Sequence, residues 1–264
     1  MKVTIIKDSL SLSTGKRITT FELQYPRFIH AELMTHRMFS RNSASSRAIP
    51  TATLIKRMKE DPAMPVHWGK NQPGMQARAE LGEYDKAECI ESWLEARDIM
   101  IEYAELLNNI GLHKQIANRI LEPWMNITVL VTATEYANFF AQRCHPDAQP
   151  EFQALATEMK KQYDANKPDP VACGGWHIPF DEPSESDIVR RIKIAVGRCA
   201  RVSYLTHDGV RDPQADVDLY DKLRTANPPH MSPFEHVASA YMDAQSSSGN
   251  FIGWLQYRHQ LFGR

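Results

Sequence analysis

Hydrophobic and polar positions along the first quarter of the chain predict strands followed by a helix. Two apolar-rich runs, residues 3–6 and 18–25, flank a turn-rich stretch that contains Ser-Thr-Gly-Lys, and this arrangement predicts a β-hairpin that ends at Pro26. From Phe28 onward, apolar residues recur at helical spacing until the polar segment 40–47 closes the element.

The middle of the chain is dominated by helical periodicity. Residues 61–76 carry three prolines and two glycines, which indicates a loop or lid. Between Cys89 and Tyr163 the pattern predicts helices throughout, with the last of them over 151–163. The proline-rich stretch 167–183 predicts a linker.

The last third of the chain mixes both periodicities. The pattern predicts a helix and then a strand over 188–205, an alternating strand over 237–244, a flexible turn at 246–249 and a closing helix over 251–262. Strand patterns near both ends, with a helical region around 88–163 between them, predict an α+β fold in which a mixed or antiparallel sheet packs with long helices.

Composition narrows the class of protein. A chain of 264 residues that is 42% hydrophobic can bury a core as one large domain or as two packed halves. The 31 Lys and Arg nearly cancel the 32 Asp and Glu, so a non-specific nucleic-acid binder is disfavoured. No apolar run approaches the roughly 20 residues of a membrane span, and the start lacks a secretory signal, so we expect a cytoplasmic protein without a membrane partner.

The four cysteines lie far apart and form no C-x-x-C pair. This spacing argues against both a disulfide framework and a tetrathiolate zinc site, so we expect all four to be reduced. Cys144 beside His145 is the one candidate thiolate pair, but adjacent helical residues point to different faces.

The segment from His36 to Arg47 concentrates hydrogen-bond donors without a balancing acid. Its three arginines after His36, four serines and one asparagine suit the binding of phosphate and pyrophosphate oxygens. A solvated basic loop is the alternative interpretation of this composition.

The spacing within this segment resembles the signature of flavin-dependent thymidylate synthases. The matching positions are His36, Arg37, Ser40, Asn42, Ser45 and Arg47. In that family the first part of the motif binds the flavin, and the final Ser and Arg hold the nucleotide. Three positions depart from the family pattern: Thr35 stands for its first Arg, Ser43 for an acidic residue, and Glu32 for a Gln near the nucleotide.

Two helical segments carry further resemblance. Residues 117–123 resemble a family segment whose Arg contacts the nucleotide phosphate, a role that falls on Arg119. The stretch with Asn138 and Arg143 resembles one that in the family ends in an Arg facing the pyrimidine base, and that position is Gln153 here. An amide pairs with uracil or cytosine but brings no cation, so we expect a weakened preference for uracil.

Residues 200–204 and 230–236 resemble two segments that open the chains of the family, although here they close the chain. We therefore expect one circularly permuted domain over 1–264. Its parts are a flavin and nucleotide motif in 1–60, the helical region 88–163, and the segment 185–264 that resembles the family's N-terminal part. Permutation is tolerable where the original termini lie near each other on the surface.

The resemblance implies a reaction and a set of ligands. It implies methyl transfer from methylenetetrahydrofolate to C5 of a pyrimidine deoxynucleoside monophosphate, principally dUMP to dTMP, with FAD as cofactor and NADPH as reductant. It also implies a homotetramer with sites shared between subunits. Alternatives are a dCMP methylase, a hydroxymethylase, a nucleotide-binding relative without turnover, and a nucleic-acid-binding module.

The resemblance assigns each candidate residue a role. The predicted catalytic residues are Gln153, Arg47 and His236, and the flavin-binding residues are His36, Arg37, Ser40, Asn42, Asn138 and Arg143. The predicted nucleotide-binding residues are Glu32, Ser45, Ser46, Arg47, Arg119 and Gln153. A buried structural role is the alternative for His36 and for His236. We expect no metal site, because His230 and His236 do not match the spacing of a zinc helix.

Overall fold

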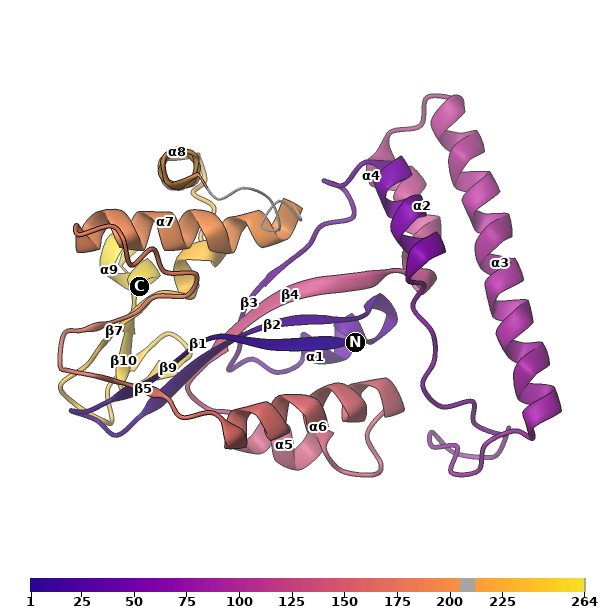
Figure 1. Cartoon of the computed structure of the whole chain (residues 1–264), viewed down its shortest axis with the longest axis horizontal. Helices are drawn as coiled ribbons and strands as arrows, with labels where there is room; N and C mark the ends of the chain where they lie inside the picture. The colour runs from indigo at the N-terminus through magenta and orange to yellow at the C-terminus, as the bar shows by residue number, and fades with distance from the viewer. Residues whose placement is uncertain (205–211, 264) are drawn as a thin grey trace.

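A five-stranded sheet with the order β3-β4-β2-β1-β5 forms the centre of the computed structural model, which describes residues 1–204 and 212–263 (Figure 1). The strands are β1 Lys2–Ser11, β2 Arg17–Pro26, β3 Ser40–Ser43, β4 Asn126–Ala133 and β5 Asp169–Val171. β1 and β2 form the predicted antiparallel hairpin, and their turn contains Gly15 at a φ of +67°. β5 pairs with β1 in parallel, so the sheet is mixed and the predicted α+β class is confirmed.

Strand β4 corrects the prediction of helices throughout the run from Cys89 to Tyr163. It pairs with β2 on one side and with β3 on the other, and every residue from Val129 to Ala133 is buried. A strand that is buried on both faces reads as a continuous apolar run, which periodicity alone does not distinguish from a buried helix.

Helices α5 (Ala137–Arg143) and α6 (Pro150–Ala165) cover one face of the sheet (Figure 1). Alternate residues of β2 and β4 point toward these helices and form the largest core cluster with them. This cluster includes Phe21, Leu23, Tyr25, Val129, Val131, Phe139, Phe152, Leu155 and Met159. The predicted helix at 151–163 is confirmed.

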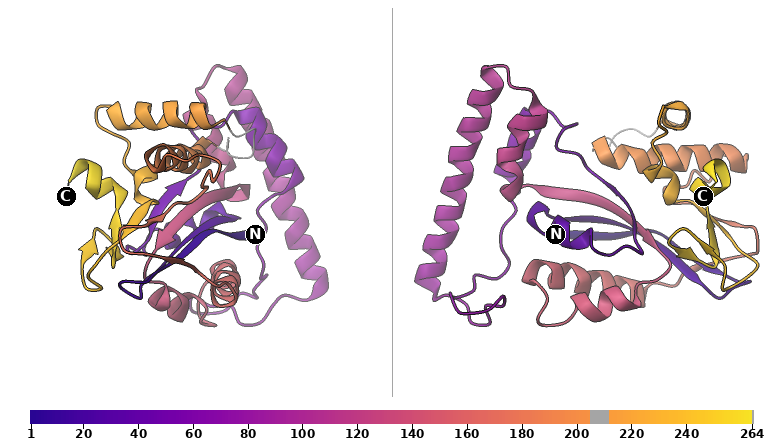
Figure 2. Two further views of the ribbon diagram at one scale, coloured as in Figure 1. Left: turned by 60° about the vertical axis from the view of Figure 1, so that its left-hand side comes forward. Right: turned by 180° about the vertical axis from the view of Figure 1, so that it is seen from behind.

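Helix α7 (Ile188–Arg201) covers part of the opposite face, where Ile6 and Leu130 pack beneath it. Helix α2 (Thr51–Glu60) lies on the same side of the sheet, toward the other end of the strands (Figures 1 and 2). The predicted helix at 188–205 is confirmed as far as Arg201. Val202–Tyr204 is a short 3₁₀ helix rather than the start of a strand, and residue 205 lies outside the described residues.

A helical layer flanks the sheet beside α2. It contains α3 Glu83–Asn109, α4 Lys114–Ala117 and the 3₁₀ helix η2 Asn118–Trp124. The short elements η1 Arg27–Ile29 and α1 His30–Leu33 follow β2, and their residues Ile29 and Leu33 pack into the core on the α5 and α6 side. The connection from 61 to 82 has no regular element apart from a bridge between Gly69 and Glu80, in agreement with the predicted loop. Among the described residues, no helix is long and apolar enough to cross a bilayer.

The C-terminal part adds small sheets and three further helical elements. The strands are β6 Trp176–His177, β7 Ala238–Ala240, β8 Ser247–Ser248, β9 Phe251–Ile252 and β10 Trp254–Gln256; the helices are α8 Pro213–Thr225, η4 Ser232–Glu235 and α9 Tyr257–Phe262.

Three predictions for this part need correction. The closing helix begins at Tyr257, because residues 251–256 pair as strands. The alternating strand over 237–244 is limited to β7. The linker 167–183 contains β5 and β6.

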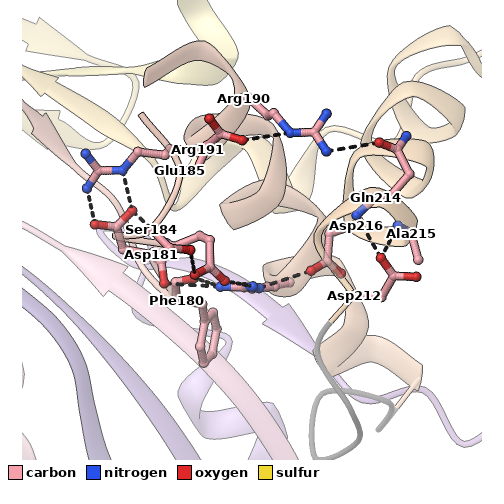
Figure 3. Close-up of polar contacts among 12 residues, drawn as sticks. Phe180, Asp181, Ser184, Glu185, Arg190, Arg191, Asp212, Gln214, Ala215 and Asp216 are labelled. Carbon is pink, nitrogen blue, oxygen red and sulfur yellow. Dashed lines mark hydrogen bonds and ion pairs between the residues drawn. The ribbon is translucent and has the colours of Figure 1, made fainter. Parts of the chain in front are cut away.

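A buried ion network joins α7 to α8 and to the segment before α7 (Figure 3). Arg198 is 3% exposed, and its guanidinium donates to Asp216 Oδ2 at 3.0 Å and to Glu182 Oε2 at 2.6 Å. Arg201 donates to the other oxygen of Asp216. The helices approach closely here, since a Cβ on Gly197 would lie 2.3 Å from the Asp216 carbonyl oxygen.

We predict that Asp216→Ala lowers the free energy of unfolding by about 3–5 kcal/mol, because it leaves the buried Arg198 charge without its main partner. Glu185→Ala, which removes the partly exposed partner of Arg190, should cost less than about 1 kcal/mol. Urea denaturation of both variants measures the difference. A loss for Asp216→Ala as small as that expected for the control would show that the Asp216 carboxylate does not stabilise this packing.

Candidate active site

Arg143, at the C-terminal end of α5, lies against α1 and the residues that follow it. Its Nε donates to His36 Nε2 at 2.9 Å, and its Nη1 donates to Glu32 Oε2 at 2.9 Å. Its guanidinium carbon lies 4.6 Å from the centre of the Phe152 ring, a cation–π contact. We call these four residues the Arg143 cluster. Thr35, which stands where the family has an arginine, also reaches it, with Oγ1 at 3.4 Å from Nη2.

The environment of His36 keeps its imidazole neutral. The ring centre lies 4.9 Å from that of Phe139 and 5.7 Å from that of Phe39. Burial, followed by the positive charges of Arg143 and Arg41, lowers the pKa of His36 to about 4. Because Nε2 accepts from Arg143, the remaining proton lies on Nδ1, which is the atom that stays available as a donor.

The Arg143 cluster opens onto a cleft of about 1260 Å³. Glu32, Arg143 and Gln153 all line it, so three of the predicted site residues meet here. Gln153 donates from Nε2 to the Cys144 carbonyl oxygen at 3.4 Å. Arg143 lines the same cleft, so the cleft carries a positive charge although position 153 is a glutamine.

The opposite wall of the cleft comes from the loop between α2 and α3. Val66 donates its backbone N–H to Glu151 Oε1 at 2.7 Å, and Arg78 pairs with Asp147 at 2.9 Å. Met75 and His67 also line the cleft. The sequence indicated a loop or lid here, but it gave no signal that these residues share a cleft with Gln153, because the contacts join positions 69 to 85 residues apart.

The central residues of the signature, Ser40 and Asn42, bind the C-terminal part of the chain. Asn42 is buried, donates to the Cys199 carbonyl oxygen at 2.6 Å and accepts from Ser203 Oγ at 2.9 Å. Ser40 is 1% exposed and accepts from Gln256 Nε2 at 3.0 Å. These polar groups therefore hold β3 against the C-terminal part and are not exposed to a ligand in this structure.

The turn after β3 carries the predicted phosphate-binding residues. Ser45 donates its backbone N–H to the Ser203 carbonyl oxygen at 3.0 Å. Ser46 Oγ and Arg119 Nη1 both donate to Glu122 Oε1, at 3.1 and 2.8 Å. Glu122 is thus an acidic residue of this region to which the sequence assigned no role. It forms an ion pair with Arg119, so the Arg119 guanidinium is already engaged within the chain.

Three predicted donors remain exposed: Arg37, Arg47 and Asn138. Within residues 1–204 and 212–263, none of these side chains has a hydrogen-bond or ion-pair partner. They are available to a ligand or to another subunit.

His236 lies in the core rather than at the cleft. It is 0% exposed, and its Nδ1 lies 2.8 Å from Thr132 Oγ1. The contacts continue from Thr132 to Thr20 at 2.7 Å, from Thr20 to His177 Nε2 at 2.8 Å, and from His177 Nδ1 to Ser9 Oγ at 2.9 Å. This geometry favours the structural alternative for His236. The predicted catalytic residues Gln153, Arg47 and His236 are not brought into contact within one chain.

No metal centre is visible in the part of the chain that the structure describes, where no three His, Cys, Asp or Glu side chains gather closely enough to hold an ion.

Comparisons with known proteins agree with this architecture. The family model described as "Thymidylate synthase complementing protein" matches residues 17–169, a range that contains the whole Arg143 cluster. The crystal structure of a UMP/dUMP methylase PolB from Streptomyces cacaoi bound with 5-Br dUMP is similar, with a TM-score of 0.51 and 18% identity over 61% of this chain and 89% of that chain. The structure of a UMP/dUMP methylase PolB from the same organism bound with 5-Br UMP gives 0.49 and 19%, over 61% and 88%. No curated protein matches the sequence.

We predict that acidification destabilises the protein through its buried histidines. Burial lowers the pKa of His236 from 6.5 to about 3, so between these values the unfolded chain binds a proton that the native state does not. The free energy of unfolding should therefore fall by about 1.4 kcal/mol per pH unit for this residue as the pH drops below 6.5. His236→Gln should remove this part of the slope. Denaturant titrations at several pH values between 7 and 5 measure it, and an unchanged slope would contradict the assignment.

Proposed function

Because the chain belongs to the family described as thymidylate synthase complementing protein, we propose that it transfers a one-carbon group to C5 of a pyrimidine nucleotide in the Arg143 cleft. The observation that carries the proposal is the convergence of Glu32, Arg143 and Gln153 on one cleft inside the matched range. The fold similarity to a methylase bound with a brominated pyrimidine nucleotide supports it.

These side chains suit the edge of a pyrimidine. Arg143 can donate to a ring carbonyl and stabilise the negative charge on the ring that makes C5 nucleophilic toward the one-carbon donor. Glu32 uses Oε2 for Arg143, which leaves Oε1 to accept from a ring N–H. In this proposal the protein orients the ring and controls its charge, and no protein thiol attacks it.

FAD belongs to the proposal, with methylenetetrahydrofolate as donor and NADPH as reductant. A reduced flavin supplies the hydride that this chemistry requires. The exposed part of the predicted donor set, Arg37 and Asn138, fits an anionic cofactor, and His36 retains a donor at Nδ1. Ser40 and Asn42 do not fit that role, because their polar groups are used within the chain.

The leading substrate is dUMP, and the product is dTMP. A specific observation favours dCMP as the second candidate: Gln153 lines the cleft, and an amide can pair with either base edge. We further propose a homotetramer and a permuted chain order. Arg37 and Arg47 are exposed and have no partner in the described part of one chain, which leaves them available to a neighbouring subunit.

We predict that the full-length protein methylates a pyrimidine nucleotide and that Arg143→Ala lowers kcat/KM by about 10²- to 10³-fold, as expected when a donor to developing charge is lost. The assay supplies dUMP, dCMP and UMP in parallel with methylenetetrahydrofolate, FAD and NADPH, and product is identified by mass spectrometry. Lys161→Ala, on the exposed side of α6, is the matched control. Nucleotide binding without any product would indicate a relative that has lost turnover and would overturn the proposal.

A second prediction concerns the phosphate. Arg47 has no partner in the described part of the chain, whereas Arg119 is already paired with Glu122. Arg47→Ala should weaken dUMP binding by about 10- to 150-fold, and Arg119→Ala by less, while FAD binding changes little in either variant. Calorimetric titration with each ligand measures this. Equal losses for both ligands would indicate general misfolding instead of a phosphate contact.

A further inference from the structure

The connection between α2 and α3 crosses from the helical layer to the far side of the Arg143 cleft (Figure 1). Its first end is fixed at Ala63, which is 1% exposed and whose backbone N–H and carbonyl group are both hydrogen-bonded to tryptophans of the helical layer. Its second end is Gly82, the N-cap of α3, beside which Glu80 pairs with Lys86 of that helix at 3.3 Å. Between these ends, every residue from 64 to 82 is exposed or only partly buried.

The 64–82 segment is held together by its own hydrogen bonds. Lys70 and Leu81 donate their backbone N–H groups to carbonyl oxygens of the opposite run, at 2.7 and 2.9 Å, and form a small hairpin. Gly69 lies at the bridge, where an added Cβ would be 2.3 Å from the Cβ of Ala77, so the two runs approach too closely for a larger residue. These contacts are internal, so they do not depend on where the segment lies relative to the cleft.

Polar contacts attach the segment to the other wall of the cleft. Val66 donates its N–H to Glu151 Oε1 at 2.7 Å, and Gln76 Nε2 donates to the Asp147 carbonyl oxygen at 3.2 Å. Arg78 pairs with the Asp147 carboxylate at 2.9 Å, and these two side chains are 73% and 45% exposed. An ion pair that is open to water contributes little and is screened by salt. Segments held in this way open locally at a low free energy.

The tip of the segment carries an apolar side chain that is not yet covered. Met75 lines the cleft but is 95% exposed, and it follows Gly74, whose φ of +100° turns the tip. The cleft itself, at about 1260 Å³, exceeds the range of about 300–1,000 Å³ that small-ligand sites usually have. An inward movement of the segment would narrow the cleft and bury the Met75 side chain against an occupant, which is favourable for an apolar group.

We propose that residues 64–82 form a lid over the Arg143 cleft, which swings about Ala63 and Gly82 with its hairpin intact. The ion pair between Arg78 and Asp147 is the latch of this lid. The lid itself follows from the contacts within the chain, and only the identity of the molecule that it encloses rests on the proposed function.

Opening and closing have different consequences for the cleft. When the lid opens, the latch and the contact of Val66 with Glu151 break, and a ligand can enter. When the lid closes over the ligand, Met75 covers it and water is excluded. Exclusion of water strengthens the interaction of the ligand with the Arg143 charge.

Residue-resolved hydrogen–deuterium exchange of the full-length protein without ligand tests the proposal. The Val66 N–H is bonded across the cleft, so its exchange measures opening of the lid, whereas the N–H groups of Lys70 and Leu81 measure opening of the hairpin. Asp147→Ala should speed exchange at Val66 by about two- to fivefold, the effect of losing one exposed ion pair. Exchange at Lys70 and Leu81 should stay as in the wild type.

Arg78→Ala should have the same effect as Asp147→Ala, and the double variant should add nothing, because all three remove the same contact. Both side chains are exposed, so their replacement leaves the fold intact. Asp164→Ala is the matched control, because it removes an exposed carboxylate that pairs with Lys160 on α6 and does not line the cleft. It should exchange at Val66 as the wild type does.

Two results of the exchange measurement overturn the proposal. Unchanged exchange at Val66 in both latch variants would show that the ion pair does not hold the segment. Equal acceleration at Val66, Lys70 and Leu81 would show that the segment unfolds instead of moving as one body.

Stopped-flow release of dUMP adds a measurement that rests on the proposed function. Asp147→Ala should release bound dUMP about two- to fivefold faster, because an unlatched lid retains the ligand less well. Release at the wild-type rate would overturn the lid. Faster exchange at Val66 in a protein that binds no nucleotide would instead count against the proposed function and leave the lid standing.

Discussion

The burial of strand β4 on both faces is the constraint on which the other parts of the molecule depend. Hydrogen bonding to β2 and β3 satisfies its backbone, while α5 and α6 cover one face and α7 covers part of the other. Helix α5 follows only a few residues after the strand ends, so the position of β4 sets the position of Arg143. The Arg143 cluster is therefore placed by the core as well as by its own contacts.

The same strand explains why the signature has two different environments. β3 pairs with the edge of β4, and Asn42 fastens it to the end of α7 through the Cys199 carbonyl oxygen. The ion network around Arg198 and Asp216 fixes α7 in turn. As a result, the interior of the signature is structural, while His36 before β3 and Arg47 after it remain near the surface. Residues that form one continuous motif in the sequence are thus divided in space. The central residues hold β3 against the C-terminal part, and the residues before and after β3 lie near the surface.

Sequence patterns predicted the helices and strands better than they predicted which residues are buried. The hairpin, α6 and α7 followed from turn chemistry and periodicity, and the resemblance selected both His36 and Arg143 before their contact was known. The patterns failed for β4, because its burial on both faces removes the alternation that identifies a strand. The patterns also could not show that Asn42 is buried and Arg47 exposed, because burial depends on which distant segment covers each residue. For His236, the spacing gave no sign that the side chain is buried against β4.

The two faces of the sheet differ in how their polar groups are used, and this difference follows from pleating. On the α5 and α6 side, β2 presents apolar residues from Phe21 to Tyr25, and beside this end of the strand Arg143 is held by Glu32 and His36. On the other side, the alternate residues of the same strand are polar where α7 no longer covers them. The charged cleft beside the sheet and the polar residues of β2 on the other face are thus both consequences of one strand's alternation. In the proposed reaction, the cleft provides a cation for a ring that accumulates negative charge.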